Sequence, residues 1–138
     1  MRILVPIILF LMVMAGCTST SNALTLEQVV AAFQNEGMQL NQTEENQENI
    51  FQQGINGVTP GVYQLSDGVI HFYMFHSEKE RIKGREDFYN RPVELVKHKA
   101  FVIHNVLIFY VYGKNQSDEV DERIKGAVAY LEKGREGK

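Results

Sequence analysis

The stretch that decides the fold is residues 62–75, Val-Tyr-Gln-Leu-Ser-Asp-Gly-Val-Ile-His-Phe-Tyr-Met-Phe. Apolar and polar side chains alternate before Asp67-Gly68, a pair that favours a tight two-residue turn, and β-forming residues follow it. Alternation with a period of two sends successive side chains to opposite faces of a strand. The stretch therefore predicts a β-hairpin with strands over residues 62–66 and 69–75.

A second hairpin is predicted further along the chain. Strands over residues 99–103 and 106–112 flank His104-Asn105, and Asn tolerates the left-handed conformation that a tight turn requires. Residues 38–41 also alternate and could form a short strand. The two hairpins together favour one antiparallel sheet.

Three helices are predicted around these hairpins. Residues 25–28, Thr-Leu-Glu-Gln, form a capping box, and apolar residues then recur at helical spacing up to Gly37. Residues 77–80, Ser-Glu-Lys-Glu, open a second helix that must end before Pro92. A third helix is marked by the apolar spacing over residues 120–131.

The expected fold class is α+β, with a single antiparallel sheet built from two β-hairpins plus a possible short strand and about three helices packed on one face. The pentapeptide Glu-Arg-Ile-Lys-Gly occurs at residues 80–84 and again at 122–126. It raises the possibility of an internal ββα duplication, although these residues are common in exposed helices and coincidence explains them equally well. Residues 43–53 are rich in Asn, Gln and Glu, and both helix and loop remain open there.

The strand patterns also predict which side chains share a face, because a two-residue turn fixes the register of a hairpin. Tyr63, Leu65 and Ile70 belong to the core face of the first hairpin. The other face of the sheet is expected to carry a dense aromatic group: His71, Tyr73, Phe75, Phe101, Tyr110 and Tyr112. Monomers rarely expose such a patch. We expect it to be a binding surface covered by a partner or a second copy, with the segment 43–58 as the alternative cover.

The N-terminus has the layout of a signal peptide, in which Arg2 precedes an apolar run over residues 3–14. The run is too short for a transmembrane helix, which needs roughly 20 apolar residues. Residues 14–17, Met-Ala-Gly-Cys, follow it and resemble the lipobox of bacterial lipoproteins. The resemblance implies that Cys17 is acylated on its thiol and becomes the first residue after cleavage.

Three regions follow from this resemblance. Residues 1–16 would be the signal peptide, residues 17–24 the lipidated cysteine with a short polar linker, and residues 25–138 a single α+β domain. The linker spans only about 15 Å as a flexible chain. The resemblance therefore implies a domain held against the extracytoplasmic face of a bacterial membrane.

Charge and cysteine content narrow the choice of partners. The chain has a formal net charge of −3, which argues against a strongly basic nucleic-acid binder. Residues 18–75 contain six acids and no Lys or Arg, whereas residues 76–99 contain seven bases and five acids. This asymmetry could orient the domain against an anionic bilayer, with an ordinary solvated surface as the alternative. Cys17 is the only cysteine, so no disulfide forms within the chain.

The sequence contains no recognisable catalytic motif, metal-ligand cluster or cofactor-binding motif. The favoured function is a lipid-anchored binding or regulatory module of the cell envelope, partnered by another envelope protein or a second copy. The alternative is a small envelope hydrolase or metal-handling protein that uses His71 or His76, for which a soft-metal site of His76, Met74 and His98 is conceivable.

Overall fold

The computed structural model describes residues 23–114 and 118–136, which form three helices and a five-stranded antiparallel sheet. The predicted α+β class is confirmed. Cys17 and the proposed signal peptide lie outside the described residues. The elements follow the chain in this order: α1 (Leu26–Asn35), β1 (Asn41–Gln42), the 3₁₀ turn η1 (Ile50–Gln52), β2 (Gly61–Leu65), β3 (Gly68–Met74), α2 (Glu78–Tyr89), β4 (His98–Ile103), β5 (Val106–Val111) and α3 (Asp118–Glu136).

The strands are arranged β1-β2-β3-β5-β4, and every neighbouring pair is antiparallel. The two hairpins therefore meet through their second strands, β3 and β5, which form the centre of the sheet. A short strand was expected at residues 38–41, and the structure has β1 at Asn41–Gln42, which overlaps that range only at Asn41. The sheet has two outer edges, a two-residue strand on one side and the six-residue strand β4 on the other.

The first hairpin turns one residue earlier than expected. Leu65 pairs with Gly68, so Ser66 and Asp67 form the turn in place of Asp67-Gly68. Gly68 follows with φ +109°, a conformation that favours glycine. Moving a turn by one residue shifts the pairing by two, which leaves every side chain on the face assigned to it.

The second hairpin has the expected register, with Ile103 opposite Val106. The residue in the left-handed region is His104, at φ +50°, and Asn105 was expected to adopt it. Asn105 instead uses its side-chain amide for contacts outside the hairpin, described below.

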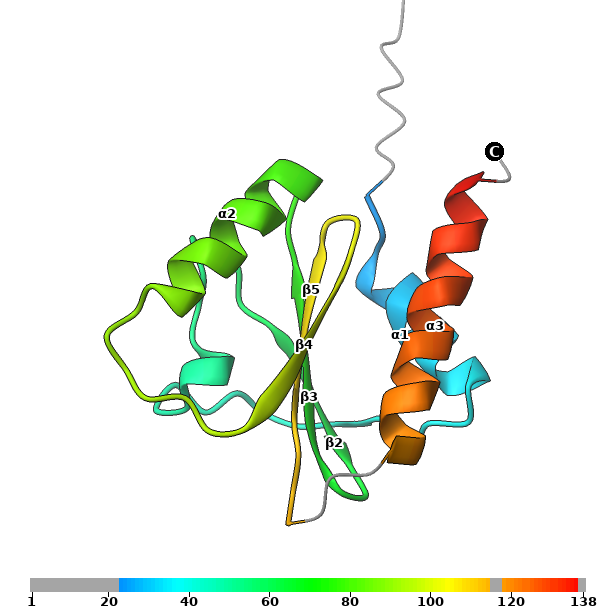
Figure 1. Ribbon diagram of the computed structural model, residues 1–138, viewed down its shortest axis with the longest axis horizontal. Helices are drawn as coiled ribbons and strands as arrows, with labels where there is room; N and C mark the ends of the chain where they lie inside the picture. Colours follow the sequence, from blue (N-terminus) through cyan, green and yellow to red (C-terminus); the bar gives the residue numbers. More distant parts are fainter. Residues whose placement is uncertain (1–22, 115–117, 137–138) are drawn as a thin grey trace, which may run out of the picture.

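One face of the sheet packs against α1 and α3, which lie side by side on the right in Figure 1. The capping box predicted at Thr25 is present, with the Thr25 side chain accepting from the Gln28 N–H and the Gln28 side chain accepting from the Thr25 N–H. Phe33 of α1 meets Phe72 of β3 edge to face, with ring centroids 5.0 Å apart. Helical spacing thus delivers the apolar stripes of α1 and α3 to this face.

The other face packs against α2 and the segment that contains η1, on the left in Figure 1. The helices therefore cover both faces, whereas all three were expected on one. The physical reason is that the second face also carries large apolar side chains and needs its own cover. Its core comprises seven buried side chains: Phe51, Ile55, Tyr73, Phe75, Phe88, Leu107 and Phe109.

The two repeats of Glu-Arg-Ile-Lys-Gly occupy unlike environments. Gly84, which ends the first, is buried against Phe75 and Ile55, whereas Gly126, which ends the second, lies beside Glu36. A duplication about the antiparallel β3–β5 contact would place α2 and α3 on the same face, yet they lie on opposite faces. The arrangement does not show the symmetry that a ββα duplication would leave.

An ion pair fastens α3 to the outer strand β4. The ammonium of Lys99 donates to Oδ2 of Asp121, whose side chain is almost completely buried. The partner oxygen Oδ1 has no hydrogen bond among the described residues. Burial makes this carboxylate dependent on Lys99 for its stability, because an uncompensated buried charge is costly.

The close approach of α2 to the sheet depends on Gly84. A Cβ at this position would lie 2.5 Å from Cζ of Phe75. We expect Gly84→Ala to destabilise the chain by about 2 kcal/mol, because overpacking outweighs the gain of about 1 kcal/mol in helix propensity. Gly134→Ala is the control, since open space surrounds Gly134 in α3, and it should leave stability unchanged or raise it. Urea unfolding followed by circular dichroism measures both, and equal effects would contradict this packing.

Candidate functional site

The six residues predicted to share one exposed face do not form one. His71, Tyr73 and Phe75 belong to the α2 side of the sheet, whereas Tyr110 and its neighbours Phe101 and Tyr112 belong to the α1 and α3 side. Four of the six are buried: His71, Tyr73, Phe75 and Tyr110. Phe101 and Tyr112 are partly buried. The prediction of a shared exposed aromatic face is therefore wrong.

The error arises where the two hairpins meet. In the β3–β5 register, Ile70 lies opposite Tyr110 and His71 lies opposite Phe109. The wholly apolar side of the second hairpin therefore joins the side of His71 and Tyr73, which is the reverse of the expected combination. Turn chemistry fixes the register within each hairpin but carries no information about the pairing between hairpins.

Tyr73 is held inside the second core by the segment 43–58. Its hydroxyl donates to the carbonyl oxygens of Phe51 and Gln53, at 2.7 and 2.6 Å. Burial raises the pKa of Tyr73 above its usual value. The segment that was the alternative cover thus covers this part of the sheet, together with α2. A partner could reach Tyr73 only after this cover had moved.

His71 lies in the same core as a neutral ring. Its Nδ1 is 3.1 Å from the carbonyl oxygen of Phe109, and because a carbonyl can only accept, Nδ1 carries the proton. Its Nε2 is buried and has no hydrogen-bond partner among the described residues. Burial lowers the pKa of His71 to about 4, while the bond to Phe109 raises it slightly. His71 therefore stays uncharged at neutral pH.

The other histidines do not gather with His71 into a metal site. No group of three or more His, Cys, Asp or Glu residues that could hold a metal ion exists within residues 23–114 and 118–136. His76 is exposed at the start of α2, and its backbone N–H donates to Glu80. The hydrolase or metal-handling alternative stays a prediction, and the described residues offer it no cluster of metal ligands.

Exposed apolar side chains gather in a different place. Six large apolar or aromatic side chains are exposed within the described residues, and five of them belong to α2, the following loop or β4. We call these five the β4-edge surface: Ile82, Tyr89, Val93, Val96 and Val102. These five residues were not among those predicted to bind a partner. The sequence offered one sign of this surface: two valines, Val93 and Val96, lie in a connection that is otherwise rich in loop-forming and charged residues.

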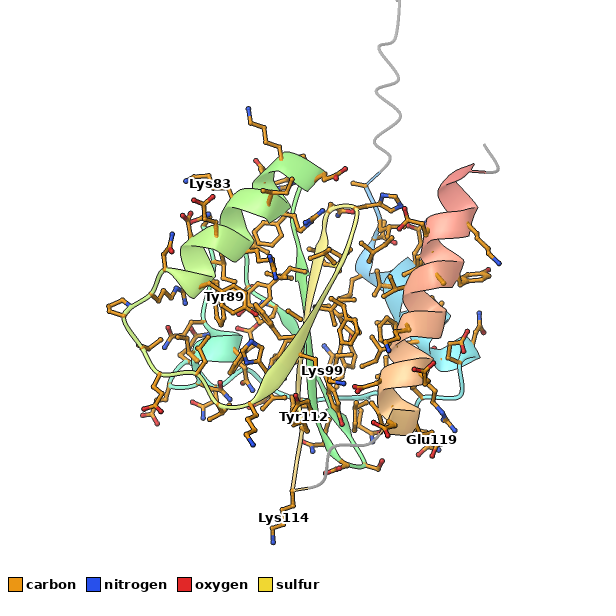
Figure 2. The ribbon with its side chains drawn as sticks, in the orientation of Figure 1. Lys83, Tyr89, Lys99, Tyr112, Lys114 and Glu119 are labelled. Atoms are coloured by element: carbon orange, nitrogen blue, oxygen red, sulfur yellow. The ribbon has the colours of Figure 1, made fainter. Side chains whose placement is uncertain are left out.

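A polar and aromatic pair joins α2 to β4 within this surface. The rings of Tyr89 and His98 stack with centroids 5.8 Å apart, and the guanidinium of Arg85 lies 5.3 Å from the centre of the Tyr89 ring. His98 donates from Nδ1 to the carbonyl of Val96, so its Nε2 accepts the hydroxyl of Tyr89 at 2.8 Å. Figure 2 shows Tyr89 toward the sheet and Lys83 on the outer side of α2. The contact between Tyr89 and His98 therefore holds the end of α2 against the start of β4.

The strand β4 is an open edge. It pairs with β5 on one side, and no other described strand pairs with it. Edge strands present unpaired N–H and C=O groups to which another extended chain can bond. An open edge flanked by exposed apolar side chains is the part of the described surface best suited to bind a protein.

The chain is fastened at the opposite end of β4, where the described residues begin. Asn105 binds Leu24 through both functions of its amide, since Oδ1 accepts the Leu24 N–H at 2.7 Å and Nδ2 donates to the Leu24 carbonyl at 3.1 Å. The same Nδ2 donates to the carbonyl of Phe75 at 2.8 Å. Asn105 thus clamps the chain entering α1 to the tip of the second hairpin.

A cleft of about 490 Å³ lies between the α1–β1 connection, the first hairpin turn and the start of α3. Met38, Leu65 and Val120 supply apolar walls, and Arg123 lies at its side. The Arg123 guanidinium already donates to the Gly37 carbonyl and to Glu119. Because these two bonds occupy its guanidinium, Arg123 is poorly placed to bind an anion in the cleft.

Comparisons with protein-family models, curated proteins and solved structures find no match for this chain. Among residues 23–114 and 118–136, no helix has both the length and the apolar character needed to cross a membrane.

The buried, neutral His71 should make the stability of the fold depend on pH. Its pKa is about 4 in the folded chain and 6.5 in an unfolded one, so the unfolded state binds the proton first. The stability contributed by neutral His71 is complete above pH 6.5 and is lost as the pH falls toward 4. Between pH 7 and pH 5, we expect the free energy of unfolding to fall by roughly 2 kcal/mol more in the native chain than in His71→Leu. Urea unfolding at both pH values measures this, and parallel losses would contradict it.

The hydrogen bonds of the Asn105 clamp should contribute to the stability of the fold. Asn105→Ala removes three hydrogen bonds, two of them to Leu24, so we expect a loss of about 2–3 kcal/mol in the free energy of unfolding. The chain before α1 should also become more sensitive to limited proteolysis. Gln47→Ala, in an exposed loop, serves as the control. Unchanged cleavage before Thr25 would show that Asn105 does not restrain this segment.

Proposed function

We propose that this chain is a lipid-anchored binding module on the extracytoplasmic face of a bacterial membrane, with Cys17 as the lipidated residue. The proposal combines the lipobox-like sequence at residues 14–17 with the clamp at Leu24. Only six residues separate Cys17 from Leu24, so the clamped end of the domain would stay within roughly 25 Å of the lipid even when the connection is fully extended. The tip of the second hairpin and the start of α2 would face the bilayer.

The observation that carries the binding role is the β4-edge surface. Ile82, Val96 and Val102 expose 52%, 61% and 40% of their surface. Exposed apolar residues concentrated on neighbouring elements, here α2, the following loop and β4, can mark an interaction site. Both faces of the sheet are covered by the chain's own helices and by the segment 43–58, which leaves this edge as the place for a partner. The partner is an envelope protein, because the lipid would confine the module to the envelope.

Cys17→Ala tests the anchoring half of this proposal. The substitution removes the thiol that would carry the lipid, so we expect loss of labelled fatty acid and of the processed form in cells. Ser19→Ala, two residues further on, should keep both. Radiolabelled palmitate and membrane fractionation measure the outcome. A Cys17→Ala chain that still carries fatty acid and has the processed size would refute the lipoprotein interpretation.

A further inference from the structure

We infer that the free edge of β4 is a strand-addition site, and that its ligand is an extended, acidic segment of a partner protein. The inference rests on the binding role proposed above and is independent of whether Cys17 carries lipid. Three observations support it: the direction of the backbone groups of β4, the side chains that flank them, and the distribution of charge between the two edges of the sheet.

The pairing pattern identifies which backbone groups of β4 point away from β5. The N–H of Phe75 donates to the carbonyl of Asn105 at 2.9 Å, so residue 105 directs its backbone toward β3. Alternation along an antiparallel strand then directs residues 106, 108 and 110 toward β4. Their partners Ile103, Phe101 and Lys99 face β5 in return. The N–H and C=O groups that point outward therefore belong to His98, Ala100 and Val102.

The flanking side chains suit an added strand. Ala100 and Val102 lie opposite Phe109 and Leu107, so their side chains lie on the α2 side of the sheet. On that side, Tyr89 contacts His98, and Ile82 of α2 is exposed. A sixth strand would lay every second side chain beside this apolar rim, while its backbone bonded to the outward groups of β4.

Charge selects the chemistry of the partner. Residues 95–114, which include β4 and β5, contain no Asp or Glu and three Lys, of which Lys99 is already bound to Asp121. The opposite edge differs, since residues 41–48 contain Glu44, Glu45 and Glu48 and no base. The segment 76–99, which contains α2 and the start of β4, carries seven bases and five acids, so an acidic strand is favoured at β4 over β1. A second copy of β4 paired antiparallel about His98 would bring Lys97 opposite Lys99, and like charges opposed across strands are destabilising.

Synthetic peptides test the inference on the detergent-solubilised full-length chain. The probe is a short, terminally blocked peptide that alternates glutamate with valine, and the comparison peptide has lysine in place of glutamate. Fluorescence anisotropy measures affinity, and nuclear magnetic resonance locates the perturbed amides. We expect the acidic peptide to perturb His98, Ala100 and Val102 and to bind about tenfold more tightly than the basic one.

Variants separate backbone pairing from charge alone. Ala100→Pro deletes an N–H that points away from β5, so no bond to β5 is lost. Edge strands tolerate Pro at such positions. We expect it to weaken binding of the acidic peptide about tenfold, whereas Ala100→Ser, which keeps the N–H, should bind normally. If Ala100→Pro fails to fold, Val102→Glu repels the acidic strand at the same edge. Tyr130→Glu is its control, because it adds the same charge at an exposed side chain of α3, outside β4 and the α2 side of the sheet.

Several results would overturn the inference. Equal affinity for the two peptides would remove the charge argument, and perturbation confined to β1 or to the cleft near Arg123 would place the site elsewhere. Self-association that Ala100→Pro or Val102→Glu abolishes would make a second copy the occupant. None of these results bears on fatty-acid attachment at Cys17, so failure of this inference and failure of the anchoring proposal are distinguishable.

Discussion

The structure depends on burying both faces of one antiparallel sheet. The central strands carry apolar side chains in both directions, with Ile70 and Phe72 on one face and Tyr73 on the other. Each face must be removed from water, so α1 and α3 cover the first while α2 and the segment 43–58 cover the second. Once both layers are in place, the edges of the sheet are the parts of its backbone that remain for a partner.

Local signals predicted most of the elements. The capping box at Thr25 and the turn at His104-Asn105 are chemical features of a few consecutive residues. Both hairpins and all three helices occupy the expected parts of the sequence, although the first hairpin turns one residue early and α2 covers the other face of the sheet. The pairing of β3 with β5 was not predictable in this way, because it joins residues 32 (Met74 and Val106) to 42 (Val69 and Val111) positions apart in the sequence through packing alone. Because this register could not be determined from the sequence, the two faces of the second hairpin were predicted the wrong way round. Tyr110 was expected on the side of His71 and lies on the side of Ile70.

The candidate site was harder to predict than the fold for the same reason. His71 and Tyr73 look like surface aromatics in an alternating strand, yet Phe51 and Phe88 arrive from distant segments to bury them. The exposed valines near β4 were visible in the sequence, but their meaning depends on β4 being an outer strand. Strand order is a property of the assembled sheet, so the surface could be recognised only after the fold was known.

Amide hydrogen exchange along β4 tests the central claim most directly. If β4 is an open edge of a sheet buried on both faces, protection should alternate. The amides of Lys99, Phe101 and Ile103 should exchange slowly, because they bond to β5, and those of His98, Ala100 and Val102 should exchange rapidly. The amides of β3, at the centre of the sheet, should all be slow. Uniform protection throughout β4 would mean that another segment covers this edge, and rapid exchange within β3 would contradict the buried sheet itself.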